Sequence, residues 1–274
     1  GGWTHPYTHQ TNGIVLRTRD GGKVWQIIPD LTLPALKVAR FFDHRRGWAA
    51  GDGSGLYPGG VFRTEDGGRT WIPIAKGRTL GWTTGDFRNG DRFERGGVVA
   101  GRGGEVAIAS MVELKPARTN NLGTRYLRRL VLAGESGGWL VGDGGLALTT
   151  KDGGFTWGTP AAPLPEAVRD FDFRAVAVLG NHCWIAGNPG SSIFHSHDGG
   201  QTWQTYRTEQ SLPIRALTFF DENRGWAVGS LGTILATRDG GRTWRQQHSG
   251  GTRAAMLGIF SEPSRVPLEV FAQQ

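Results

Sequence analysis

The chain has 274 residues and a formal net charge of +7, and Arg supplies most of its 31 basic residues. This length accommodates one domain with a substantial core, and no apolar stretch reaches membrane-spanning length. The 45 glycines recur at fixed places, which indicates turns rather than disorder, and the single cysteine, Cys183, excludes an internal disulfide.

One short segment recurs along the chain and organises the rest. It reads Ser/Thr, Asp two places on, Gly-Gly, and Trp five places after the Asp; its copies are Thr18 to Trp25, Thr64 to Trp71, Thr150 to Trp157, Ser196 to Trp203 and Thr237 to Trp244. Asp-Gly-Gly after an apolar run is typical of a hairpin turn, in which the carboxylate accepts backbone N–H groups and the glycines adopt positive φ. The Trp returns on the next strand and covers the turn. We therefore predict a structural staple, and not a catalytic acid or a metal ligand.

The spacing between copies predicts stacked units of four short strands each. The chain opens inside a repeat, with Gly2-Trp3 as a second strand and Ile14 to Thr18 as a third. Later repeats are expected over about Lys37 to Ile74, from Leu80 onward, Arg128 to Trp157, Arg174 to Tyr206 and Arg215 to Gln247.

Two parts of the chain depart from this plan. The third repeat carries a polar insertion, Asp86 to Arg95, and the segment 111–122 has lost the Asp, the Gly pair and the Trp of its expected turn. At the other end, Ala254 to Phe260 is predicted to be one more inner strand, which could complete the partial first repeat and close a ring.

The pattern Ser/Thr-x-Asp-x-Gly-x-Thr-Trp resembles the Asp-box, or bacterial neuraminidase repeat, of β-propellers. A second recurring piece, Arg-Gly-Trp-Ala-Ala-Gly at 46–51 and Arg-Gly-Trp-Ala-Val-Gly at 224–229, is similar to the photosystem II assembly/stability factor family. The resemblance covers nearly the whole chain and implies an all-β propeller of four-stranded blades. We expect six blades closed by the C-terminal strand, or seven if one blade is missing, with the propeller over 1–260 and a linker or truncated start of a following segment over 261–274.

The resemblance also implies a non-catalytic assembly module with an arginine patch that binds an acidic polypeptide tail. A basic residue lies at or near the start of nearly every predicted inner strand: Lys37, Arg78, Arg129, Arg174, Arg215 and Arg253, with Arg102 expected on the same face. Asp52 and Asp143 are candidate internal partners. Two interpretations remain open: each cation pairs locally, or together they line a channel mouth that recognises an anionic partner.

Other functions have weaker sequence support. Sialidases are also Asp-box propellers, so a sialidase-like or glycan-binding domain of a larger exported protein is the alternative; Tyr57 and Tyr126 could reach the loop face. His195-Ser196-His197 could hold a metal, but a surface histidine pair is favoured, and no metal or cofactor is expected. We expect no specific nucleic-acid partner, because no recognition motif occurs. We also expect a monomer, located outside the cytoplasm.

Overall fold

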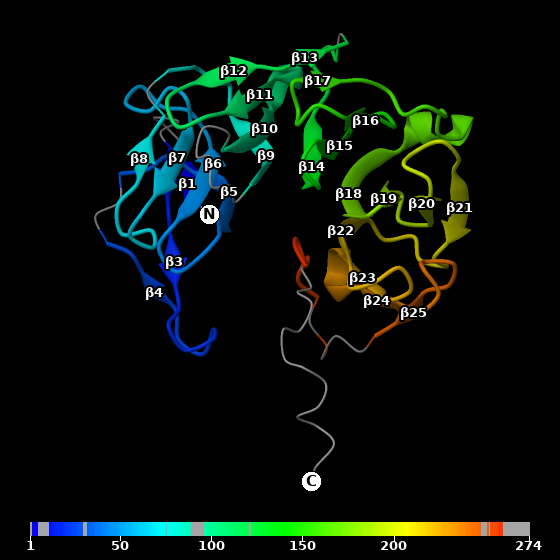
Figure 1. The fold of residues 1–274 in the computed structure, drawn as a ribbon. Helices are drawn as coiled ribbons and strands as arrows, with labels where there is room; N and C mark the ends of the chain where they lie inside the picture. Colours follow the sequence, from blue (N-terminus) through cyan, green and yellow to red (C-terminus); the bar gives the residue numbers. More distant parts are fainter. Residues whose placement is uncertain are drawn as a thin grey trace. The chain divides into compact units, whose positions relative to one another are not determined.

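Almost all of the regular secondary structure of the described residues consists of short, mostly antiparallel β-sheets (Figure 1). The computed structural model describes residues 2–4, 11–29, 32–74, 76–88, 96–120, 122–247, 251 and 253–259. The chain divides into two compact units, residues 1–160 and 161–274. None of the helices within these described residues has the length and apolar character needed to cross a bilayer.

Each repeat forms a sheet that we call a blade, in which consecutive strands pair with one another in chain order. The first unit contains blade I, with β5 (Leu36–Phe41), β6 (Gly47–Gly51), β7 (Val61–Thr64) and β8 (Ile72–Pro73), and blade II, with β9 (Trp82–Phe87), β10 (Gly97–Gly101), β11 (Val106–Ala109) and β12 (Leu114–Pro116). It also contains blade III, in which β14 (Leu127–Ala133), β15 (Gly137–Gly142) and β16 (Ala147–Thr150) form a three-stranded sheet. In this blade the fourth strand, β17 (Thr156–Trp157), is joined to β16 by an isolated bridge between Thr149 and Gly158. The second unit contains blade IV, with β18 (Asp172–Leu179), β19 (His182–Asn188), β20 (Ser192–Ser196) and β21 (Gln204–Arg207), and blade V, with β22 (Ile214–Phe219), β23 (Gly225–Gly229), β24 (Ile234–Thr237) and β25 (Arg245–Gln246).

The core lies between neighbouring blades of one unit. The second strands are short apolar runs, as expected for strands covered on both faces, and β6 and β10 are buried along their whole length. Trp48 of blade I stacks on Phe87 of blade II with ring centroids 5.4 Å apart. In the second unit, Trp184 of blade IV stacks on Phe219 of blade V. Burial of these aromatic rings provides the apolar area that holds adjacent blades together.

The recurring turn joins the third and fourth strands, as predicted. In the last copy, the Thr237 hydroxyl donates to Asp239 (2.8 Å) and accepts the Gly241 N–H (2.9 Å), while Asp239 accepts the N–H and hydroxyl of Thr243. Gly240 and Gly241 have φ of +75° and +91°. The predicted structural role of this turn is therefore confirmed: the Asp carboxylate accepts hydrogen bonds within the turn, and both glycines have positive φ.

Each such turn also contacts the hairpin between the first and second strands of its own blade. The first glycine of the turn donates its N–H to a hairpin carbonyl in four blades: Gly67 to Arg45, Gly153 to Ser136, Gly199 to Asn181 and Gly240 to Asn223, at 2.7–2.9 Å. Both turns therefore lie at the same end of the blade, which we call the box end. The opposite end, where the first strand begins, is the loop end.

Several predicted boundaries need correction. The first partial repeat forms β1 (Gly2–Thr4), β2 (Thr11–Gly13), β3 (Leu16–Arg17) and β4 (Gln26–Ile27), so its third strand starts earlier than predicted and is interrupted. Asp86, placed in the polar insertion, instead belongs to β9, where it is buried and paired with Arg40; residues 89–95 of the insertion lie outside the described residues.

The predicted closing strand over Ala254 to Phe260 is wrong for the residues described. Residues 253–259 form no strand; Gly232 N–H donates to the Ala254 carbonyl and Met256 N–H to the Gly229 carbonyl. Phe260 and residues 261–274 lie outside the described part of the chain. The number of blades and the division at residue 260 therefore stay predictions.

The degenerate turn of blade II has a different structure from the other turns. Its outgoing segment forms β12 and then β13 (Arg118–Thr119), which pairs in parallel with β17 of blade III. Glu113 forms a bridge to Lys76, which follows blade I. A segment that lost its own turn thus connects its blade to both neighbours in the first unit.

Candidate partner-binding site

The first strand of every blade contains a β-bulge near its start. The pairing register skips one residue at this position in all five blades; the skipped residues are Lys37, Thr83, Arg128, Arg174 and Arg215. Such a β-bulge redirects a side chain away from the regular pleat. Four of the five bulge residues are cations, so the same β-bulge carries a positively charged side chain in four blades.

A second recurring position comes directly after a glycine at or near the end of the second strand of each blade. It is occupied by Asp52, Arg102, Asp143, Asn188 and Ser230. In four blades its N–H donates to the carbonyl just before the first strand: Asp52 to Ala35, Arg102 to Gly81, Asp143 to Tyr126 and Ser230 to Pro213, at 3.0–3.1 Å. The backbone therefore places this residue beside the bulge at the loop end.

In the first unit, two loop-end cations meet carboxylates. Arg128 forms a two-pronged contact with Asp143, in which Nη2 lies 2.9 Å from Oδ2 and Nε contacts Oδ1. Its guanidinium also lies 4.7 Å from the ring centre of Tyr126. Arg102 lies 3.6 Å from Asp52 and keeps about half of its side chain exposed. The prediction that Asp52 and Asp143 serve as internal partners is confirmed.

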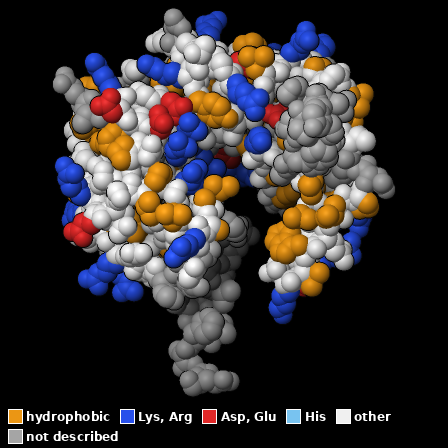
Figure 2. Space-filling model, turned by 180° about the vertical axis from the view of Figure 1, so that it is seen from behind, with side chains coloured by type: hydrophobic (Ala, Val, Ile, Leu, Met, Phe, Trp, Pro, Cys, Tyr) orange, Lys and Arg blue, Asp and Glu red, His pale blue; other side chains and the backbone are white. Residues whose placement is uncertain are grey.

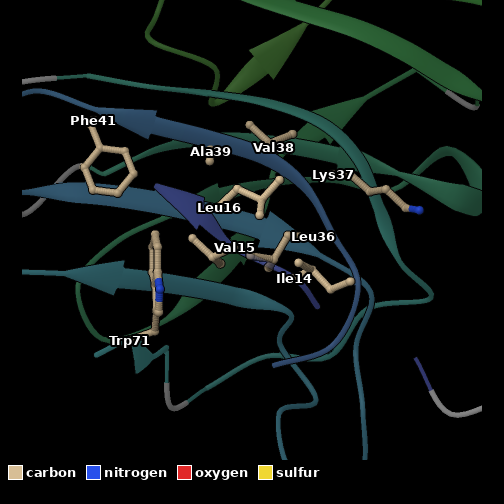
Figure 3. A pocket seen from close by; sticks show the side chains of 9 residues that line it. All are labelled: Ile14, Val15, Leu16, Leu36, Lys37, Val38, Ala39, Phe41 and Trp71. Carbon is tan, nitrogen blue, oxygen red and sulfur yellow. The ribbon is translucent and has the colours of Figure 1, made fainter. Parts of the chain in front are cut away.

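Lys37 borders an apolar groove in the first unit. Ile14, Val15 and Leu16 line one wall, and β5 and Trp71 supply the other side chains. Figure 3 shows Lys37 at one end, with its ammonium group directed away from the apolar side chains. The cation is exposed, as expected for a charge that keeps its hydration.

In the second unit, Arg174 and Arg215 occupy equivalent bulges on neighbouring first strands, β18 and β22. Arg215 Nε donates to the Ser230 hydroxyl at 3.2 Å. Because that hydroxyl is uncharged, the contact positions the guanidinium without neutralising it. Arg174 Nη2 forms an ion pair with Asp172 of its own strand at 3.8 Å.

Three predicted residues lie off the recurring positions. Arg129 follows the bulge of β14, whose bulge residue is Arg128, so the prediction for this blade is displaced by one residue. Arg78 precedes β9 and is exposed, whereas the bulge of β9 is Thr83. Arg253 is exposed and, within the described residues, precedes no strand.

Arg129 belongs to a different charge cluster in the first unit. Desolvation lowers the pKa of Arg129, and the charge of Asp86 opposes that shift. Asp86 also contacts Arg40 and accepts the N–H of Leu132 on β14 at 2.9 Å. Because Asp86 thereby links the first strands of three successive blades, this cluster has a structural role of its own.

The sequence could have identified Arg128. The first strands align as Leu36-Lys37, Trp82-Thr83, Leu127-Arg128, Phe173-Arg174 and Ile214-Arg215, with a buried apolar residue always directly before the bulge. In blade II, Thr83 occupies the bulge, and the cation stands at the second position as Arg102. Each blade of the described chain therefore presents at least one cation at its loop end, from one of two recurring positions.

The tyrosines and histidines considered for a glycan or metal site do not all lie where the sequence predicts. Tyr126 lies at the loop end under Arg128, while Tyr57 is partly buried against Phe62. The prediction of a surface pair at His195 and His197 is wrong, because His195 is buried and hydrogen-bonds His182 at 3.0 Å. The described residues contain no group of three or more His, Cys, Asp or Glu side chains arranged to hold a metal ion.

Comparisons with known proteins agree with this architecture. Residues 124–218 match the family described as photosynthesis system II assembly factor YCF48. The photosystem II assembly lipoprotein Ycf48 of Picosynechococcus sp. (strain ATCC 27264 / PCC 7002 / PR-6) is 33% identical over 188 residues, which cover 65% of this chain and 52% of that protein. The protein of the same name from Synechococcus sp. (strain CC9902) is 33% identical over 113 residues, covering 40% of this chain and 33% of that protein.

A solved structure described as YCF48 bound to D1 peptide superposes with a TM-score of 0.63 at 20% identity, covering 87% of this chain and 77% of that one. The matched regions span a third to about half of the length of these curated relatives. Together with the five blades and their recurring turns, these findings show that the chain is an Asp-box β-propeller protein that resembles the photosystem II assembly/stability factors.

Proposed function

We propose that this chain is a non-catalytic binding module that docks an acidic peptide, or another carboxylate-rich partner, on the cations at its loop ends. The observation that carries this proposal is the repeated first-strand bulge, which presents Lys37, Arg128, Arg174 and Arg215 from equivalent backbone positions. Arg102 adds a cation from the neighbouring recurring position in blade II. Guanidinium groups suit carboxylates because they can donate two parallel hydrogen bonds to them.

The overall charge favours the same partner. Lys and Arg outnumber Asp and Glu by 31 to 24, and blue basic side chains recur across the face in Figure 2. A positive field accelerates encounter with an anionic segment, and the individual guanidinium groups then provide its position. Both effects weaken as salt rises.

The relatives support a binding role in assembly. They are named as photosystem II assembly proteins, and the similar solved structure is described as peptide-bound. The proposal accordingly includes no catalytic step, and turnover of a fluorogenic sialoside would contradict that part of it. Two relatives are named lipoproteins, which supports a location outside the cytoplasm.

The test uses a labelled Asp/Glu peptide, a charge-reversed Lys peptide and fluorescence anisotropy at low and physiological salt. Arg174→Ala/Arg215→Ala removes two loop-end charges from the second unit. Arg238→Ala/Arg242→Ala removes the same charge from an exposed turn at the box end of that unit and serves as the matched control. We expect the loop-end variant to lose at least about tenfold in affinity and the control to lose about twofold or less. Equal losses, or equal binding of both peptides, would reduce the interaction to nonspecific charge attraction.

A further inference from the structure

A leucine at the loop end of blade V has a backbone conformation that leucine rarely adopts. Leu231 has φ +53° and ψ +35°, and its side chain is 60% exposed. It follows Ser230, the residue whose hydroxyl accepts from Arg215. A bulky side chain in the left-handed region is strained, and exposing it to water adds a further cost.

Blades II and III show which residue this loop conformation holds elsewhere in the chain, whereas the loop of blade I has Gly53 outside the positive-φ region and that of blade IV has Pro189. The equivalent loops read Gly101-Arg102-Gly103-Gly104 in blade II and Gly142-Asp143-Gly144-Gly145 in blade III, against Gly229-Ser230-Leu231-Gly232 in blade V. Gly103 and Gly144 have φ of +70° and +65°, so the loop requires a left-handed residue here, and glycine supplies it without strain. Folding alone therefore favours glycine at 231.

The loop holds Leu231 firmly in this conformation. Gly229 N–H donates to the Thr233 carbonyl at 3.0 Å, and both the N–H and hydroxyl of Thr233 donate to the Ser230 carbonyl. Ser230 N–H donates to the carbonyl of Pro213, two residues before Arg215. The apolar side chain is thus presented at a defined place beside a cation, rather than on a free loop.

A second cation borders the same loop. Gly232 N–H donates to the Ala254 carbonyl at 2.8 Å. The residue before Ala254 is Arg253, which is exposed, so this hydrogen bond holds the backbone at Arg253 close to the loop. The loop end of blade V therefore combines an exposed leucine with Arg215 and Arg253.

We propose that Leu231 is an apolar contact for the partner, so the preferred ligand is an acidic peptide that carries a large apolar side chain among its carboxylates. This inference rests on the proposed function and narrows its partner class. The arginines account for the carboxylates by charge complementarity. Leu231 accounts for an apolar side chain in the peptide beside those carboxylates, because the two side chains would bury each other in the complex and Leu231 would no longer be exposed to water.

The test compares two labelled peptides that differ at one residue, an Asp/Glu peptide with a central Leu and the same peptide with Ser. Wild-type protein is expected to bind the Leu peptide about tenfold more tightly, the effect of burying one aliphatic side chain. Leu231→Gly is expected to abolish this preference, leave the affinity for the Ser peptide unchanged, and leave the melting temperature unchanged or higher. Val112→Ala shortens a similarly exposed side chain (65%) at the outer edge of blade II and should preserve the preference.

The outcomes separate the two proposals. If both peptides bind wild type equally and Arg174→Ala/Arg215→Ala weakens both, the acidic-peptide function stands and the leucine contact is wrong. If Leu231→Gly keeps the full preference, or lowers the melting temperature, Leu231 serves folding and the inference falls. If neither peptide binds wild-type protein, the proposed function itself fails.

Discussion

The two ends of each blade handle charge in opposite ways. At the box end, Asp66, Asp152, Asp198 and Asp239 each accept the N–H and hydroxyl of the Thr four residues later, so the same side chains recur in the same contacts. At the loop end, the backbone bulge recurs but its side chain varies among Lys, Thr and Arg. The box end, where the same side chains repeat, stabilises the fold. The loop end, where only the backbone bulge repeats, is the end that we propose binds the partner.

The carboxylates of the box end are already satisfied within their own turns. Burial raises the pKa of Asp66, but hydrogen bonds from the hydroxyl and N–H of Thr70 and from Thr64 outweigh it and bring the pKa to about 2. A carboxylate held in this way has few acceptor sites left for an outside ligand. Two loop-end guanidinium groups are held less tightly: Arg102 lies 3.6 Å from Asp52, and Arg215 donates to a neutral hydroxyl, whereas Arg128 forms a two-pronged pair with Asp143.

The largest expected effect breaks the box end of blade III. Gly153 and Gly154 both have positive φ, but a Cβ at Gly154 would overlap Val98 of blade II, whereas nothing lies closer than 3.7 Å to a Cβ at Gly153. Gly153→Ala should lower the free energy of unfolding by about 1 kcal/mol through backbone strain, and Gly154→Ala by about 3 kcal/mol, because overlap adds to strain. Urea titration followed by tryptophan fluorescence measures both. Equal losses would mean that the packing of Val98 on this turn contributes nothing.

A pH dependence of intermediate size is expected at the box end of blade IV. Desolvation, together with the nearby charges of His182, His197 and Arg242, lowers the pKa of His195 from 6.5 to about 4. The unfolded chain therefore binds this proton more readily than the folded one. The stabilising contribution is complete above pH 6.5 and is lost as pH falls toward 4, by roughly 2 kcal/mol.

Replacing the two histidines in turn isolates this contribution. His195→Gln should reduce the slope of unfolding free energy against pH between 6.5 and 4. His197→Gln, two residues away and exposed, removes only one of the smaller causes of the shift and should retain most of the wild-type slope. Urea titrations at pH 7.5, 5.5 and 4.5 suffice, and a His195→Gln slope identical to wild type would refute the assignment.

The smallest expected effect on stability is at the loop end. Arg128→Ala removes the pair with Asp143, whose side chains keep 24% and 29% exposure, so the loss of unfolding free energy should be about 1 kcal/mol or less. Affinity for the acidic peptide should nevertheless fall several-fold, since the charge is removed from the proposed site. A loss above about 3 kcal/mol would place Arg128 in the fold rather than at a binding surface.

Much of the fold could be predicted from the sequence because its signals are local. The Asp-Gly-Gly turns, the apolar second strands and the boundaries of blade V, including β23 over Gly225–Gly229, follow from turn chemistry and short apolar runs. The prediction failed where tertiary contacts decide. Asp86 reads as part of a polar loop, yet Arg40 and the Leu132 N–H hold it inside β9.

The candidate site was predicted less completely for the same reason. The prediction of Lys37, Arg174 and Arg215 rests on a basic residue at or near the start of nearly every inner strand. In blade III two adjacent arginines fit that description, so it does not separate Arg129 from Arg128, and the pairing of Leu127 with Gly142 and Arg129 with Val141 identifies Arg128 as the bulge residue.

The sequence by itself determined the repeating unit, its turn chemistry and the excess of positive charge, because these depend on residues near one another in the chain. Tertiary structure decided which carboxylates meet the loop-end cations, that Asp86 is buried among three first strands, and that Leu231 is held in a left-handed conformation where blades II and III have glycine. Those features arise from pairing between strands and from loops that bring distant residues together.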